Sequence, residues 1–153
     1  MALCRSYGLS AAPLGFQLLV AEAKAEEGRT DDALAIVDDL LAAMELSGEH
    51  QYEAQTRRLR ANLLRRRPGH GQAEAAFLAA LETTRRQKTR ALELRAAIDL
   101  AELYSGPDQQ ARARDVLESA LHALPEGGAL PEAEQARRLL VSLQSAKAAR
   151  PMH

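Results

Sequence analysis

Apolar residues recur along this chain at the spacing of amphipathic helices. Between residues 31 and 46 they stand three, four and seven positions apart, which gathers them on one face of a helix: Ala33, Ile36, Val37, Leu40, Leu41 and Met44. The same spacing returns within residues 71–87 and 108–124. Apolar segments of similar length precede each of these, and one more follows the last of them. The pattern therefore predicts seven helices, at residues 13–27, 31–46, 51–67, 71–87, 89–104, 108–124 and 131–147.

The residues between these segments are typical of helix ends. Gly28 follows the first segment, and Thr30 offers an N-cap that is followed by two acidic residues, Asp31 and Asp32. Glycine and proline interrupt the chain at residues 68–71 and 106–107, and Pro131 suits a first helical turn. Each predicted helix therefore has a start or stop signal close to it.

The seven segments also form a repeat with a fixed period of about 40 residues. Small residues recur in two columns, and a bulky apolar residue follows the second of them: Ala21, Ala61 and Ala101; Ala33, Ala73 and Ala113; Val37, Phe77 and Leu117. Gly8, Gly48 and Gly128 share another column, which Lys88 interrupts. In this register residues 1–7 correspond to the end of a second helix, with Met1 aligned with Leu41. A fixed period of this length is typical of stacked helical hairpins.

These columns resemble the tetratricopeptide repeat (TPR) family, which places small residues at the same internal positions. The third repeat is most similar, with Leu100, Tyr104 and Pro125 at further motif positions, whereas Gln17, Arg57 and Ala97 stand where the family often has Trp. The period is also longer than the usual repeat of about 34 residues. The longer repeat resembles the helical arrays that follow the ATPase module of large bacterial signalling ATPases, through residues 52–61, 73–81 and 93–103.

The resemblance implies an all-α fold, a right-handed array of antiparallel helix hairpins (an α-solenoid) with about seven helices. We expect one repeat domain over residues 1–148, with a frayed tail at 149–153; its repeats span about 13–47, 51–87 and 89–127, and a capping helix spans 131–147. Alanine at helix crossings permits close approach of the two helices of a hairpin. An ordinary helical bundle is the alternative, but a bundle does not require a fixed period.

Composition and charge limit the kinds of function that the protein can have. The single cysteine, Cys4, excludes an internal disulfide and a multi-cysteine metal site, and it fits a reducing, cytoplasmic setting. No apolar run is long enough to span a membrane. The net charge of −1 conceals an asymmetry: residues 1–50 carry nine acidic and three basic side chains, whereas residues 51–100 carry five acidic and eleven basic ones. Only the middle third could therefore form a basic patch.

No residue pattern indicates catalysis, a cofactor or a metal. The four histidines, His50, His70, His122 and His153, have no histidine or cysteine three or four positions away and are interpreted as solvated. The adjacent carboxylates Asp31 and Asp32 are explained by the start of a helix. No phosphate-binding glycine motif is present. We therefore expect a protein that is not an enzyme.

The candidate binding residues lie on the first helices of the repeats, around a cluster of arginines (Arg57, Arg58, Arg60, Arg65, Arg66 and Arg67). The structural alternative for this cluster is a solvated helix face. In TPR-like arrays certain positions of the first helices face a groove, and the resemblance assigns these positions to Gln55, Arg58, Asn62 and Arg65, flanked by Leu18, Glu22, Ile98 and Glu102. Arginine suits carboxylate partners, which favours an acidic guest.

The sequence therefore predicts a non-catalytic protein-interaction module, as in the regulatory array of a larger bacterial signalling ATPase or transcriptional regulator. Its partner would be a protein or an acidic peptide, other domains of the same polypeptide, or a second copy of the chain in a homodimer. Nucleic-acid binding through residues 57–67 is the alternative; it lacks a set of stacking aromatic residues.

One further expectation concerns charge in apolar columns. Arg60 shares a column with Val20, Leu100 and Leu140, and Asp99 shares one with leucines. Burying either charge alone would cost several kcal/mol. We expect Arg60 and Asp99 to face one another, or each to be paired locally.

Overall fold

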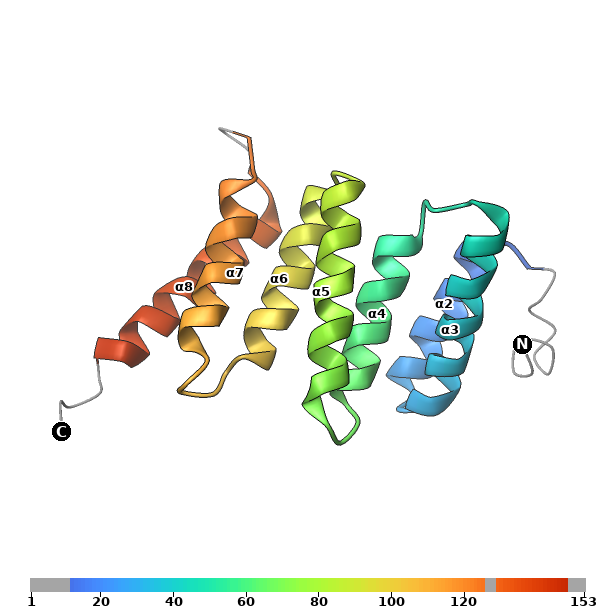
Figure 1. The fold of residues 1–153 in the computed structure, drawn as a ribbon, viewed down its shortest axis with the longest axis horizontal. Helices are drawn as coiled ribbons and strands as arrows, with labels where there is room; N and C mark the ends of the chain where they lie inside the picture. The colour runs from blue at the N-terminus through green and yellow to red at the C-terminus, as the bar shows by residue number, and fades with distance from the viewer. Residues whose placement is uncertain (1–11, 126–128, 149–153) are drawn as a thin grey trace. The chain divides into compact units, whose positions relative to one another are not determined.

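The computed structural model describes residues 12–125 and 129–148, and all of its regular structure in these ranges is α-helical (Figure 1). The helices are α2 (Leu14–Glu26), α3 (Thr30–Ser47), α4 (Glu53–Arg65), α5 (His70–Arg86), α6 (Arg90–Leu103), α7 (Gln110–His122) and α8 (Pro131–Ala148). The all-α prediction is confirmed, and each of the seven expected helices is present with both ends within two residues of the predicted bounds. The expectations for residues 1–7, Cys4, Gly8, Gly128 and the tail at 149–153 lie outside the described residues.

The chain divides into two compact units, Met1–Thr83 and Thr84–His153, with the boundary inside α5. In the first unit α3 packs against both α2 and α4, and α2 also touches α4. In the second unit α6, α7 and α8 contact one another in the same pattern. Within each unit, a helix therefore packs against its successor along the chain, and the first helices of consecutive pairs meet. This is the contact pattern of a helical array.

The repeat columns are buried, which explains why their residue types recur. The alanines of both small columns are at most 3% exposed, and Val37, Phe77 and Leu117 are fully buried. A larger residue at the alanine positions would have to displace a neighbouring helix, because protein interiors are close-packed. The same residue types therefore recur with the period of the repeat because they occupy equivalent positions in the packing of the helices.

The core of the first unit joins three helices. Leu18 of α2 packs with Leu40 and Met44 of α3, and partly buried side chains surround them: Leu14, Leu41, Tyr52 and Leu59. A Cβ atom at Gly15 would lie 2.9 Å from the Tyr52 ring, so the start of α2 requires a glycine to approach α4 this closely.

The helix ends agree with the sequence signals except at one cap. Gly28 and Gly48 have positive φ, as expected after a helix, and Asp31 and Asp32 occupy the first turn of α3. Thr30 is not the N-cap, because it is already helical; the N-cap is Arg29, whose side chain makes no capping hydrogen bond. Arg29 instead forms an ion pair with Asp32.

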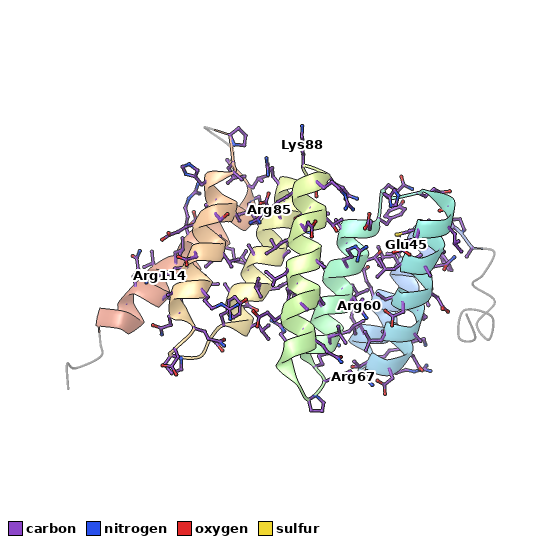
Figure 2. All side chains as sticks on the ribbon, in the orientation of Figure 1. Glu45, Arg60, Arg67, Arg85, Lys88 and Arg114 are labelled. Atoms are coloured by element: carbon purple, nitrogen blue, oxygen red, sulfur yellow. The ribbon has the colours of Figure 1, made fainter. Side chains whose placement is uncertain are left out.

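Lys88 provides a test of the glycine column. It has φ of 54° and lies one repeat period after Gly48, which has φ of 73° (Lys88 is labelled in Figure 2). A left-handed residue other than glycine costs about 1–2 kcal/mol, while an added glycine loses about 0.4–1 kcal/mol through the entropy of the unfolded chain. Lys88→Gly should therefore stabilise the protein by about 0.5–1 kcal/mol, and Gly48→Ala should destabilise it by a similar amount.

Urea denaturation of the two variants beside the parent measures both shifts. A Cβ at Gly48 would meet no atom within 4 Å, so the loss in Gly48→Ala would report the backbone conformation alone. Midpoints that move in the same direction for both variants would contradict this explanation.

Candidate functional site

The polar row along α4 is positioned by the packing of the opposite face of that helix. Glu53, Thr56 and Leu64 are buried at 6% exposure or less. Gln55, Arg58, Asn62 and Arg65 follow one another at intervals of three, four and three residues, so they share one face of α4. All four are partly exposed. We call these four residues the α4 polar row.

The structure joins this row to α2. The Gln55 side-chain amide donates a hydrogen bond of 3.0 Å to a carboxylate oxygen of Glu22, which is also partly exposed. Further along the row, the side-chain amide of Asn62 donates to the backbone carbonyl of Arg58 at 3.2 Å. Five of the eight predicted groove residues are therefore brought together in the first unit, on the adjacent helices α2 and α4.

The two apolar residues expected beside the groove are buried instead. Leu18 is 2% exposed in the core cluster with Leu40 and Met44, and Ile98 is 3% exposed in the second unit. Leu18 stands one helical turn before Ala21, which is itself fully buried, so it shares the packed face of α2. Neither side chain is available to a bound partner, and the interpretation of both as groove contacts is wrong. Glu102 is exposed on α6.

Several of the clustered arginines contact acidic groups or a carbonyl of their own chain. Arg60 donates to Asp38 at 2.7 Å and Arg67 contacts Asp31 at 3.1 Å, which ties α4 and the residues after it to α3 (both arginines are labelled in Figure 2). Arg57 pairs with Glu53 at 2.8 Å, and Arg66 donates to the carbonyl of Ala25 at the end of α2. The acidic first third and the basic middle third of the sequence are therefore joined by ion pairs within one unit.

The two charges expected in apolar columns have different surroundings. The side chain of Arg60 is 37% exposed, so it is not buried as its column indicated, and its partner is Asp38. A long side chain can cover apolar surface with its stem while its charged end reaches water. Asp99 is 8% exposed. In the described part of the chain, every buried side-chain nitrogen or oxygen has a hydrogen-bond partner.

Two buried glutamates, which occupy the same repeat column, were not predicted from the sequence. Glu53 is 5% exposed and contacts the Nδ1 atom of His50 at 3.1 Å and Arg57 at 2.8 Å. Glu93, one period later, is 1% exposed and lies 3.0 Å from Arg85 and 2.7 Å from Arg90. His50 and Arg90 are also one period apart. The column was visible in the sequence, so the repeat could have identified these carboxylates.

A further ion pair fixes the start of α8 in the second unit. The guanidinium of Arg95 on α6 donates twice to one carboxylate oxygen of Glu132, at 2.6 and 2.9 Å. A hydrogen bond from the backbone lowers the pKa of Glu132, and the bonds from Arg95 lower it further. The carboxylate of Glu132 therefore accepts hydrogen bonds both from the backbone at the start of α8 and from Arg95 of α6.

Other chemistry is not indicated in the described residues. Within them, no three histidine, cysteine or acidic side chains gather in an arrangement that could hold a metal ion. No helix of the described part combines the length and the apolar character needed to cross a membrane. No protein-family model matches the sequence, and no curated protein matches it. The α4 polar row with Glu22 is the candidate site that the geometry supports.

Proposed function

We propose that the protein is a non-catalytic interaction module that binds a partner protein through the α4 polar row and Glu22. The observation that carries the proposal is the Glu22–Gln55 hydrogen bond of 3.0 Å, which links two first helices beside a row of partly exposed donors. In helical arrays such adjacent first helices form an extended binding surface. The sequence resemblance to TPR arrays extends the proposal to a regulatory array of a larger bacterial signalling protein.

The chemistry of the row favours an acidic segment of the partner. Arg58 and Arg65 lie seven residues apart, which is about 10 Å along a helix at about 1.5 Å per residue. A guanidinium can pair with a carboxylate through two parallel hydrogen bonds. Glu22 stands at the Gln55 end of the row, where it would repel a carboxylate. The guest would therefore place its acidic groups toward Arg58 and Arg65.

The arginine contacts within the chain support a protein partner over a nucleic acid. Non-specific binding to nucleic acid depends on several cations that neutralise phosphates. Arg57, Arg60 and Arg67 already pair with carboxylates, and these carboxylates would repel a phosphate backbone. These three arginines are thus less suited to neutralise phosphates than the sequence indicated.

A charge-reversal variant tests the proposal. The probe is a fluorescently labelled poly-glutamate decapeptide in low-salt buffer, and its fluorescence anisotropy reports binding. Arg58→Glu combined with Arg65→Glu should weaken binding by at least about tenfold, which corresponds to about 1.4 kcal/mol. Far-UV circular dichroism should be unchanged, because both side chains are on a partly exposed face.

The matched control is Arg137→Glu with Arg138→Glu, which reverses the same number of charges on exposed positions of α8. The control should reduce peptide binding much less, since it changes only the net charge. Equal losses in the two double variants, or intact binding in Arg58→Glu with Arg65→Glu, would refute the proposed surface. Tighter binding of a single-stranded oligonucleotide than of the peptide would favour the nucleic-acid alternative.

A further inference from the structure

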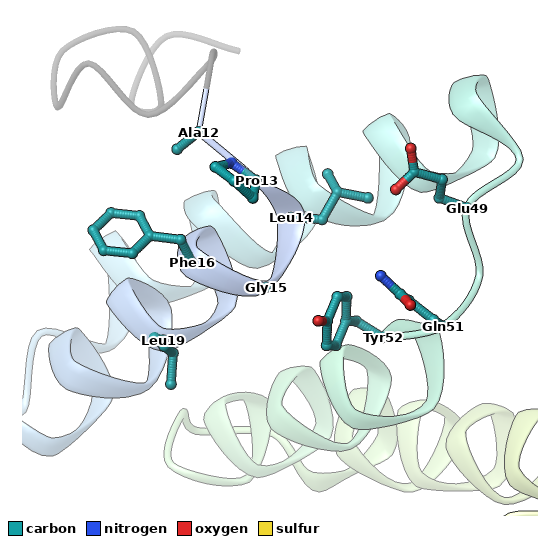
Figure 3. A pocket seen from close by; sticks show the side chains of 9 residues that line it. All are labelled: Ala12, Pro13, Leu14, Gly15, Phe16, Leu19, Glu49, Gln51 and Tyr52. Carbon is teal, nitrogen blue, oxygen red and sulfur yellow. The ribbon is translucent and has the colours of Figure 1, made fainter.

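A hollow of about 620 Å³ lies at the start of α2, beside the loop that leads into α4 (Figure 3). It is lined in part by Ala12, Phe16 and Leu19 of the α2 region and by Tyr52 at the start of α4. Phe16 is 53% exposed and Leu19 is 61% exposed. Two large apolar side chains are thus open to solvent on one side of α2, within the first unit, and the α4 polar row does not include them.

The next repeat shows what covers this face of a first helix. Ala12, Phe16 and Leu19 correspond, one period later, to Tyr52, Thr56 and Leu59. On α4 these positions are closed: Thr56 is fully buried, and Tyr52 and Leu59 pack against the cluster that contains Leu40 and Met44. That cluster combines Leu18 of α2 with Leu40 and Met44 from the second half of α3, the helix directly before α4, and Leu41 of α3 packs beside it. The equivalent face of α2 would accept a segment with apolar residues at the same spacing.

The sequence contains such a segment one period before the second half of α3. Met1 aligns with Leu41, and Cys4 aligns with Met44. We propose that residues 1–7 of the same chain bind the α2 face formed by Phe16 and Leu19 and fill the hollow. The repeat register supports this assignment, because it aligns Met1 and Cys4 with Leu41 and Met44, which belong to or pack against the cluster beside α4 in the following repeat. Residues 1–7 lie outside the described residues.

The reactivity of Cys4, the only cysteine in these 153 residues, tests the proposal. A thiol held against an apolar face reacts with an aromatic disulfide reagent only when the segment opens. We expect Cys4 to react at least about tenfold more slowly in the native protein than in urea, equivalent to about 1.4 kcal/mol of docking. Phe16→Glu combined with Leu19→Glu should remove this protection. Both positions are exposed in the described structure, so the double change should leave the helices intact.

Leu78→Glu is the control, because Leu78 is also an exposed apolar residue, 48% accessible, on α5. It should leave Cys4 protected. Native Cys4 that reacts as fast as the unfolded chain would overturn the proposal. So would protection that survives Phe16→Glu with Leu19→Glu while circular dichroism shows an intact fold. Protection that disappears on dilution would identify a second copy of the chain as the occupant and would also overturn it.

Discussion

Replacing Leu40 with alanine should lower the free energy of unfolding by about 2–5 kcal/mol. Leu40 is fully buried and belongs to the cluster that joins α2, α3 and α4. The substitution removes apolar area from the core and leaves a cavity that helices fixed on two sides cannot readily close. Because a domain of this size is stabilised by only about 5–15 kcal/mol, the loss should be evident in urea denaturation.

The same helix supplies the matched control. Leu46 of α3 is 82% exposed, and Leu46→Ala changes the same atoms with the same small effect on helix propensity. We expect it to change the free energy of unfolding by no more than about 0.5 kcal/mol. If the two variants were destabilised equally, α3 would not be packed in the way described.

The positions of the helices could be predicted because two independent signals coincide. The helical spacing of apolar residues locates each helix, and the repeat period shows which of its residues face a neighbour. Ala33, Ala73 and Ala113 meet both conditions, and all three are fully buried. Even Lys88, which breaks the glycine column, has the positive φ that its place in the column indicates. Thr30 is not the cap that its residue type predicts, because the end of a helix depends on local backbone angles that the side-chain type only favours.

The candidate site was less predictable, because a groove depends on which face of each helix is covered. The family positions placed Gln55 and Glu22 on adjacent helices, where they bond, but they also assigned Leu18 to the groove, although it packs inward. Leu18, which packs inward, and Glu22, which bonds to Gln55, are only one helical turn apart on α2. The buried glutamates were not predictable from their immediate neighbours, because Glu53 and Glu93 are related only by the period of the repeat.

The second large loss of stability is expected when the ion-pair partners of Glu93 are replaced. Glu93 is 1% exposed in the first turn of α6, and its partners Arg85 and Arg90 are themselves partly exposed. Removing both arginines would leave a buried charge without these ion pairs, which typically costs about 3–5 kcal/mol. Arg85→Met with Arg90→Met preserves much of the apolar stems, so the loss should come from the charge. We expect this double variant to be destabilised by about 3 kcal/mol.

A third substitution separates the charge from the packing. Glu93→Gln in the double variant removes the buried charge and keeps the shape, and it should recover most of the lost stability, whereas Glu93→Gln alone should destabilise the parent. This reversal of sign is the coupling that a mutant cycle measures. Arg137→Met with Arg138→Met is the control, because Arg138 pairs with Glu134 where both side chains are exposed, and such pairs contribute about 0–1 kcal/mol. If Glu93→Gln were equally destabilising in the parent and in the double variant, Arg85 and Arg90 would not be what stabilises the buried carboxylate.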